Sequence, residues 1–417
     1  MTTHGPDTEP ACPGPTSGPG SAITHDARPA AALRVERLPF DAIGRDTWDD
    51  LAARNPWATP FSRWAFHRAW WDAYGASAHD QTLIVCADHA SGTAATDEPI
   101  AIVPLMHRHE VEESDPATAS KLRGLGSGRL TPVPATAKAV FFGASYHSDY
   151  ATILGSPDHF DSVTRAVVED LAGPEPSDPE HPMDWDAIDL RRLRCGDPAA
   201  DALAAAFGTR EVAEGWTLNL EREDVCPVVH LVPGMSFEEY LSGLDKKARH
   251  EIRRKLRRAE GAGEITFEHV AEPLADLDAF IDMHQGKWGE NGLFPPTPGG
   301  DASRVFLRRW FEEEGPTGAA ELHFLSVGDR RIAAGILVDD GKRLMFWNAG
   351  VDAGAPELSP GVVLAARCIQ LAMDRGRTAF DFLRGNEPYK YEWGSADEPI
   401  QRLLVRRDDT RLAEAST

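Results

Sequence analysis

The order of expected secondary-structure elements repeats once along the chain, and this repeat constrains the fold more than any other feature. In each half, two helical patterns precede three strand patterns, a further helix and a further strand. The stretch LIVCAD…PIAIVPL in the first half resembles LHFLSVGDRRIAAGILV in the second. A length of 417 residues leaves room for two or three domains. We therefore expect two tandem copies of one mixed α/β domain, over residues 31–220 and 221–410, with loop insertions in the first copy.

The N-terminal segment and the cysteines indicate where such a chain works. Residues 1–30 are rich in Gly, Pro, Ser and Thr and lack the apolar core of a signal peptide, which predicts a disordered tail. No apolar run approaches the roughly 18 residues that a membrane helix needs. The five cysteines are scattered without a C-x-x-C spacing, which favours reduced thiols over a disulfide framework or a zinc site. We expect a cytoplasmic protein that spans no membrane and holds no metal.

The overall charge and the missing motifs exclude several classes of function. A formal net charge of −23 repels polyanions, so binding of nucleic acid would need a local basic patch. The sequence contains no G-x-S-x-G elbow, no P-loop, no Rossmann glycine fingerprint and no H-E-x-x-H. These absences argue against serine hydrolases, P-loop nucleotide hydrolases, Rossmann dehydrogenases and zinc proteases.

A first candidate site lies between Asn348 and Val363, where a strand leads through a glycine-containing loop into a helix that opens with Ser-Pro-Gly. Free N–H groups at a helix start bind phosphate well, and glycine lets the backbone approach a pyrophosphate closely. This pattern makes Asn348, Ser359 and Gly361 candidate cofactor-binding residues. The alternative is simple capping of the helix by Ser359.

A second candidate site is the stretch DFLRGNEPYKYEWG, which begins at Asp381. Charged and aromatic side chains crowd the carboxyl end of a strand there, which is the edge where ligands bind in open α/β sheets. We take Asp381, Glu387 and Lys390 as candidate catalytic residues. Arg384 and Tyr389 are candidates for contact with the substrate.

A third candidate is the expected helix around residues 245–261, which carries eight Lys or Arg against two acids between residues 245 and 258. Its apolar stripe at helical spacing predicts packing against a core, and Arg253 and Arg257 flank that stripe. Two interpretations stay open for this helix. It is either a solvated basic face or a surface that contacts the phosphates of a cofactor or an RNA.

A fourth candidate is the stretch MHQGKWGENGLFPP, in which a helix brings His284, Lys287 and Trp288 to a Gly- and Pro-containing loop. A single histidine in such a place is more often structural than catalytic. We expect this loop to form a lid or a wall of the acceptor site, with Trp288 and Trp347 as substrate-contacting residues.

Taken together, these stretches resemble a known family. The run from Phe237 to Arg407 is similar to the GNAT acetyltransferase domain of CelD-like proteins, relatives of the FemABX peptidyltransferases. The matching stretches are KKARHEIRRKLRRAE, HQGKWG, IAAGILV, SPGVVL…FDFLRG and EPYKYEWG. The first half resembles a degenerate copy of the same domain through ATPFSRWAFHRAWW and SDYATILG. The resemblance implies two tandem GNAT-like acyl-CoA N-acyltransferase domains.

The resemblance also implies transfer of an acyl group, with acetyl-CoA or another acyl-CoA as co-substrate, to an amine of a small molecule or a cell-envelope precursor. In FemABX enzymes the donor is an aminoacyl-tRNA, and a lysine in an aromatic-Lys-x-x-aromatic-Gly motif contacts the reacting group. Tyr389, Lys390, Trp393 and Gly394 match that motif. The stretch APELSPG departs from the Q/R-x-x-G-x-G/A loop of GNAT enzymes, so CoA and tRNA both remain possible donors.

The mechanism that we expect is direct attack of the amine on a thioester, without a covalent enzyme intermediate. Because an alkylammonium has a pKa of about 10, it must first lose a proton, and Glu387 or Asp381 would accept that proton. Lys390 or backbone N–H groups would stabilise the oxyanion. The rival interpretation is a non-catalytic binding or accessory protein of envelope polysaccharide assembly. The acceptor, the acyl length and the oligomeric state stay open.

Overall fold

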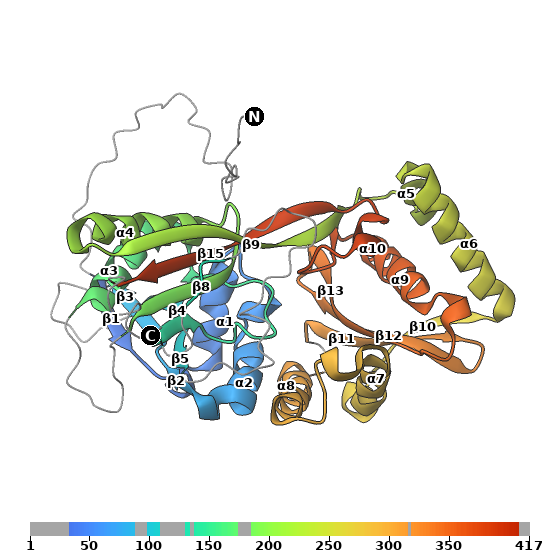
Figure 1. Cartoon of the computed structure of the whole chain (residues 1–417), viewed down its shortest axis with the longest axis horizontal. Coiled ribbons are helices and arrows are strands. Elements are labelled where there is room, and N and C mark those ends of the chain that lie inside the picture. Colours follow the sequence, from blue (N-terminus) through green and yellow to red (C-terminus); the bar gives the residue numbers. More distant parts are fainter. Residues whose placement is uncertain are drawn as a thin grey trace, which may run out of the picture.

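A computed structural model describes residues 33–87, 98–108, 130–133, 137–173, 185–315 and 318–407. These residues form two lobes joined by two long strands, β9 (Thr217–His230) and β15 (Ala396–Arg406), which pair with each other along the middle of the molecule (Figure 1). The tail expected over residues 1–30 lies outside the described residues. Among the helices that the structure describes, none is both long enough and apolar enough to cross a membrane.

The N-terminal lobe contains four α-helices and eight strands in its described part. The helices are α1 (Arg45–Arg54), α2 (Trp64–Tyr74), α3 (Phe160–Ala172) and α4 (Pro198–Glu214). The strands are β1 (Leu33–Arg37), β2 (Ala78–Asp80), β3 (Leu83–Ala87), β4 (Pro99–Val103), β5 (Leu105–Arg108), β6 (Ala139–Phe142), β7 (Leu154–Gly155) and β8 (Ala187–Arg194).

The C-terminal lobe repeats this mixture of helices and strands. Its helices are α5 (Phe237–Gly243), α6 (Lys246–Ala262), α7 (Pro273–Trp288), α8 (Pro298–Glu314), α9 (Pro360–Asp374) and the short α10 (Pro388–Tyr391). Its strands, apart from the two shared ones, are β10 (Ile265–His269), β11 (Ala320–Val327), β12 (Arg330–Asp339), β13 (Arg343–Val351) and β14 (Ala379–Asp381).

One sheet runs through both lobes. Its strand order is β10-β11-β12-β13-β14-β9-β15-β8-β6-β5-β2, and a smaller sheet in the N-terminal lobe has the order β1-β3-β4-β7. Strand β15 comes last in the chain, yet it returns to the N-terminal lobe and pairs antiparallel with β8. The domain boundary expected at residues 220 and 221 therefore falls inside β9, which both lobes share.

The mixed α/β class and the repeated element order are confirmed by these elements. Six of the described α-helices and strands were not predicted from the sequence, namely β2, α4, β9, α5, β10 and α10. For α4 a signal was present, because Asp197 accepts a hydrogen bond from the N–H of Ala199, Pro198 opens the helix and Gly215 ends it in the left-handed region. Strand β9 was hidden by Glu223, Asp224 and Pro227, which are unusual in a central strand.

The sheet of the C-terminal lobe is covered on both faces. Along β12, Ala334, Ile336 and Val338 belong to the core cluster that includes α7 and α8. Their neighbours Ala333 and Leu337 belong to the cluster that includes α6 and α9. Side chains alternate across a strand, so α7 and α9 must lie on opposite faces of the sheet, as Figure 1 shows.

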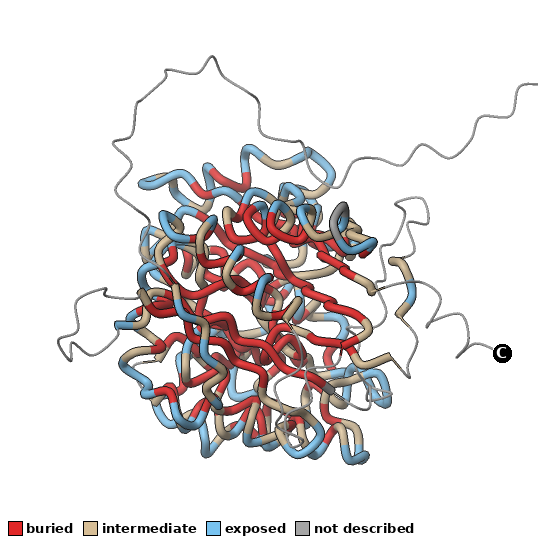
Figure 2. Tube along the Cα trace, turned by 90° about the vertical axis from the view of Figure 1, so that its left-hand side faces the viewer, coloured by how far each residue is buried: buried red, intermediate tan, exposed pale blue. Residues whose placement is uncertain are grey.

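One of the hydrophobic core clusters spans both lobes. Helix α2 packs against α8, and the ring of Phe66 meets that of Trp310 at a centroid distance of 5.1 Å. Buried residues from both lobes, among them Trp70, Tyr150 and Phe306, belong to the same cluster. Figure 2 shows buried chain through the whole interior.

The thiols fit the expected reduced state only in part. Cys86, Cys226 and Cys368 are free and buried. Cys195 is disulfide-bonded, so the expectation of reduced thiols throughout is wrong at this residue.

Candidate functional site

The site begins where two parallel strands separate. Strands β13 and β14 pair from Arg343 opposite Ala379 to Met345 opposite Asp381, and the pairing stops there. Strand β13 continues to Val351. The segment that follows β14 turns away at Leu383, whose φ of 57° lies in the left-handed region. Beyond Met345, no strand in the described part of the chain pairs with this edge of β13, so the sheet is open there.

A cavity of about 490 Å³ occupies this opening. The end of α7, strand β13, the start of α9 and the loop that follows β14 all contribute to its wall. Most of the residues predicted for the site line it: Trp288, Trp347, Asn348, Ser359, Gly361, Arg384, Glu387, Tyr389 and Lys390. The structure therefore brings together three of the four stretches that the sequence singled out.

A β-bulge at Trp347 shapes the floor of the cavity. The register between β12 and β13 shifts so that Phe346 faces Leu337 and Asn348 faces Ile336, which leaves Trp347 as the extra residue. The indole N–H of Trp347 donates to the backbone oxygen of His147 in the other lobe at 3.0 Å. The bulge turns this ring toward the junction of the lobes.

The side chain of Asn348 forms a hydrogen bond within its own strand. The Oδ1 atom of Asn348 accepts a hydrogen bond from the N–H of Ala349 at 2.8 Å. Both Asn348 and Ala349 line the cavity beside the opening between the strands.

Helix α7 approaches β13 more closely than a side chain would allow. A Cβ atom at Gly350 would lie 2.6 Å from the backbone nitrogen of His284, so only glycine fits there. The Nδ1 atom of His284 lies 3.2 Å from the backbone oxygen of Ala349, and its Nε2 accepts from the N–H of Leu293 at 3.1 Å. Burial lowers the pKa of His284 to about 4. His284 is thus a neutral structural histidine, as expected.

The loop that follows β14 is organised by Lys390. Its Nζ donates to the carbonyl oxygens of Leu383, Arg384 and Gly385 at 3.0, 2.8 and 2.9 Å. The same atom lies 2.9 Å from Oε2 of Glu387, and the Lys390 side chain is buried. The oxyanion role predicted for Lys390 does not fit this geometry, because its N–H groups already point at three carbonyls. Lys390 holds the loop, and Glu387 remains in the wall of the cavity.

Asp381 lies behind the cavity and is fully buried, outside the set of residues that line it. Its Oδ2 accepts from the hydroxyl of Tyr150 at 2.7 Å, and its Oδ1 accepts from the N–H of Leu383 at 2.8 Å. Burial is the largest cause that raises the pKa of Asp381, to about 6. Direct proton transfer from a substrate amine to Asp381 does not fit this enclosed position.

The N-terminal lobe contributes to the cavity wall as well. Asp149 lines the cavity, and its Oδ1 lies 3.3 Å from Nε of Arg384. Tyr150 follows it in the chain and binds Asp381. The sequence analysis missed both residues, because nothing local in the stretch SDYATILG marks them as neighbours of a site more than 230 residues away.

The start of α9 closes the other end of the cavity. Ser359 precedes the helix with φ of 53°, and its side chain makes no capping hydrogen bond. Instead, its Oγ accepts a hydrogen bond from Nη2 of Arg258 in α6 at 2.8 Å. The simple capping interpretation for Ser359 is therefore wrong, and Arg258 is a cation beside the cavity that the sequence analysis did not select.

Arg253 and Arg257, predicted to bind the cofactor, do not line this cavity. They line a separate crevice of about 470 Å³ between α5, α6 and α9. Arg253 forms an ion pair with Glu238 of α5. Residues 253 and 257 share one side of α6, whereas Arg258 is a further 100° around the helix and reaches α9. Arg253 and Arg257 therefore lie outside the cavity, whereas Arg258 of the same helix lies beside it.

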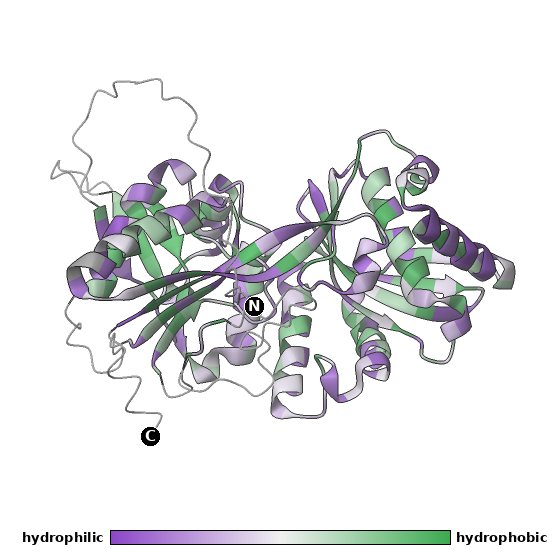
Figure 3. Cartoon of the chain, turned by 45° about the horizontal axis from the view of Figure 1, so that its top comes forward, coloured by the Kyte–Doolittle hydropathy of each residue, from purple (hydrophilic) through white to green (hydrophobic). Residues whose placement is uncertain are grey.

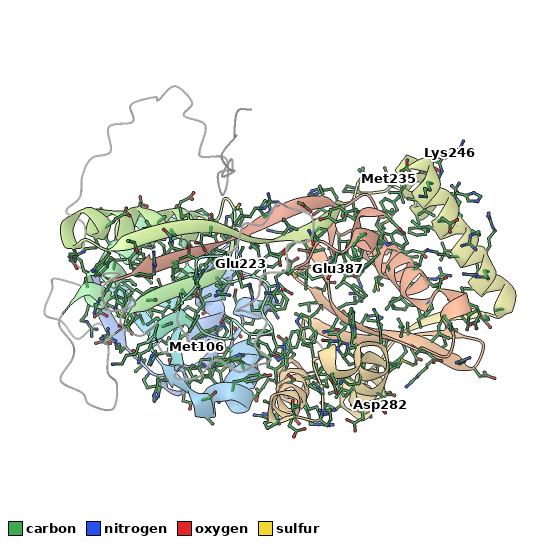
Figure 4. All side chains as sticks on the ribbon, in the orientation of Figure 1. Met106, Glu223, Met235, Lys246, Asp282 and Glu387 are labelled. Carbon is green, nitrogen blue, oxygen red and sulfur yellow. The ribbon has the colours of Figure 1, made fainter. Side chains whose placement is uncertain are left out.

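The part of the chain that the structure describes contains no cluster of His, Cys, Asp or Glu able to hold a metal ion. The cavity wall combines apolar and aromatic side chains with carboxylates and cations. Figure 4 places Glu387 close to where the two lobes meet. The cavity wall extends from the start of α9 to the end of α7.

Comparisons with known proteins support this interpretation of the fold. Residues 246–391 match the family model described as an acetyltransferase (GNAT) domain. The crystal structure of FemX has a TM-score of 0.52 and 9% identity, covering 86% of this chain and 96% of that one. A conserved protein of unknown function from Bacteroides thetaiotaomicron has a TM-score of 0.50 and 10% identity, covering 88% of this chain and 98% of that one.

A tandem GNAT protein from the clavulanic acid biosynthesis pathway has a TM-score of 0.42 and 10% identity, covering 90% of this chain and 98% of that one. No curated protein matches the chain. The matched acetyltransferase domain lies in the C-terminal lobe, and the N-terminal lobe repeats its element order. The match to an acetyltransferase (GNAT) domain thus falls in the second half of a mixed α/β fold whose element order repeats.

Proposed function

We propose that the chain transfers an acyl group, most simply acetyl, from acyl-CoA to an amine of a small molecule or a cell-envelope precursor. The observation that carries this proposal is the opening between β13 and β14, which leads from the start of α9 to the end of α7. The match of residues 246–391 to an acetyltransferase domain supports the same reaction class.

The donor would enter beside α9. The N–H groups of a helix start carry partial positive charge, and Arg258 adds a full charge at Ser359. A thioester carbonyl would then lie along the unpaired edge of β13. Backbone N–H groups there, such as that of Ala349, could stabilise the oxyanion that forms during attack.

The acceptor amine would lose its proton to Glu387. This carboxylate lines the cavity, and its side chain is 42% exposed although one oxygen contacts Lys390. Direct attack on the thioester forms the amide bond, breaks the carbon–sulfur bond and releases CoA as a thiolate, which takes up the proton that the attacking nitrogen loses. No covalent intermediate on the protein is required for this reaction.

The experiment that tests the proposal measures donor binding and turnover separately. Acetyl-CoA and free CoA should raise the melting temperature in a concentration-dependent way, because ligands that bind only the folded state stabilise it. Release of CoA should then depend on an added amine. If neither acetyl-CoA nor longer acyl-CoAs bind at millimolar concentration, the proposal is wrong.

An aminoacyl-tRNA is the second candidate donor, and one observation favours it. Helix α6 is strongly hydrophilic and lies at the edge of the C-terminal lobe (Figure 3). Its exposed cations include Lys246, Lys247, Arg254 and Arg257, on a chain of net charge −23. Retardation of tRNA in a gel, lost as salt rises and unaffected by acetyl-CoA, would favour this donor over CoA.

A further inference from the structure

Lys287 lines the cavity beside the ring of Trp288. It lies in the last turn of α7 and lines the cavity from the face of the sheet opposite to α9. Its Nζ lies 4.5 Å from the ring centroid of Trp288, which is 44% exposed. The ammonium is therefore placed over an aromatic wall at the end of the cavity where the acceptor would enter.

The other cations of the cavity wall already have anionic partners. Arg384 lies 3.3 Å from Asp149, and Lys390 contacts Glu387 together with three carbonyls. Lys287 differs, because among the residues that the structure describes no carboxylate forms an ion pair with it. Burial lowers the pKa of Lys287, and the charge of Glu387 counteracts this effect from a distance.

Such a cation gains most from an anion that arrives with a ligand. Nearby Glu387 suits the ammonium end of the same ligand, and the two side chains interact electrostatically without touching. A molecule with an amine and a separate anionic group would satisfy both at once. Charge-assisted hydrogen bonds from lysine to a carboxylate or a phosphate are among the stronger polar contacts.

We propose that Lys287 binds an anionic group of the acceptor, a carboxylate or a phosphate, and thereby selects amines that carry a negative charge over neutral amines. This inference rests on the proposed function, because it assigns the α7 end of the cavity to the acceptor. It makes Lys287 a residue of substrate specificity. It also separates the two ends of the cavity, with the donor phosphates beside Arg258 and the acceptor anion beside Lys287.

The test uses pairs of amines that differ in the anionic group. The pairs are β-alanine with propylamine, 4-aminobutyrate with butylamine, and 2-aminoethyl phosphate with ethanolamine. Calorimetry on the full chain without donor measures their affinities for the wild type, Lys287→Gln and Lys287→Arg. Lys342→Gln is the matched control, because Lys342 is an exposed lysine in the turn between β12 and β13, outside the cavity wall.

We expect at least one anionic amine to bind about tenfold more tightly than its neutral counterpart, as a charge-assisted contact allows. Lys287→Gln should abolish this preference, whereas Lys287→Arg and Lys342→Gln should keep it. A preference for the carboxylates or for the phosphate identifies which anion the site takes.

Three results would overturn the inference: equal affinities within every pair, an unchanged preference in Lys287→Gln, or a Lys287→Gln variant that instead loses affinity for acetyl-CoA. Failure of the proposed function looks different. In that case no amine would release CoA from acetyl-CoA, while the Lys287-dependent preference in donor-free calorimetry would persist.

Discussion

The hydroxyl of Tyr150 in the N-terminal lobe donates a 2.7 Å hydrogen bond to Asp381 at the end of β14 in the C-terminal lobe. Through its other oxygen, Asp381 holds the N–H of Leu383, where the chain turns away from β13. The N-terminal lobe thus fixes the turn that opens the candidate site. It is part of the site's construction even though the acetyltransferase match covers only residues 246–391.

Replacement of this hydroxyl should weaken the turn. In Tyr150→Phe, Oδ2 of Asp381 loses the hydroxyl donor and keeps, among its described partners, only the ion pair with Arg343 at 3.5 Å, which should cost about 1–3 kcal/mol of unfolding free energy. Tyr391→Phe is a suitable control, because the Tyr391 hydroxyl binds Asp397 at the exposed surface. Urea unfolding measures both variants, and equal stability of the two would contradict a structural role for the buried bond.

The titration of Asp381 should make the unfolding free energy depend on pH. Burial raises the pKa of Asp381 from 3.8 to about 6 in the folded protein, so the folded state holds more protons than the unfolded state between these values. Stability should therefore fall as pH rises from about 4 to about 6, by an amount on the order of 2 kcal/mol.

The variant Asp381→Asn removes this titration. The difference in unfolding free energy between wild type and variant should change across pH 4 to 6 and stay constant above pH 7. A difference that is constant over the whole range would show that Asp381 has the same pKa in both states.

Substitutions at Lys390 and Glu387 should affect different properties, stability in the first case and turnover in the second. Lys390→Met leaves three carbonyl oxygens around residues 383–385 without their shared donor, so stability should fall by about 2–4 kcal/mol and turnover should fall with it. Glu387→Gln keeps the shape of a half-exposed side chain and should lower turnover with little change in melting temperature. A stable Lys390→Met protein with low turnover would restore the catalytic role for Lys390.

Two glycines of the site should respond in opposite ways to alanine. Gly350→Ala would place a Cβ atom 2.6 Å from the backbone of α7, so it should destabilise the fold by about 1–3 kcal/mol. At Gly361 the nearest atom is 4.0 Å away, so Gly361→Ala should fold normally. Because Gly361 lines the cavity, that variant should instead weaken donor binding, which thermal shifts with acetyl-CoA would measure.

Substitutions on two sides of the basic helix α6 test which side of the helix contacts the donor. Arg258→Glu should weaken acetyl-CoA binding, with a larger effect at low salt, because screening reduces exposed electrostatic contacts. The pair Arg253→Glu and Arg257→Glu changes twice the charge on another side of the helix and should alter the affinity less. A larger loss in the double variant would return these two residues to the donor site.

Much of this protein is readable in its sequence. The alternation of β1, the continuous apolar run of β12, the Ser-Pro-Gly start of α9 and the stop of α4 at Gly215 are local signals that act within a few residues. The crowding of charged and aromatic residues after Asp381 located the loop that lines the cavity. Such signals arise from backbone periodicity and turn chemistry, which neighbouring residues alone determine.

Only the tertiary structure decided what individual side chains do. Lys390 is tied to three carbonyls, Asp381 is enclosed behind Tyr150, and Arg258 rather than Arg257 reaches Ser359. Each of these outcomes depends on how strands and helices far apart in the chain pack against one another. Burial and partners determine whether a charged group is free to act on a ligand, and neither is a property of the local sequence.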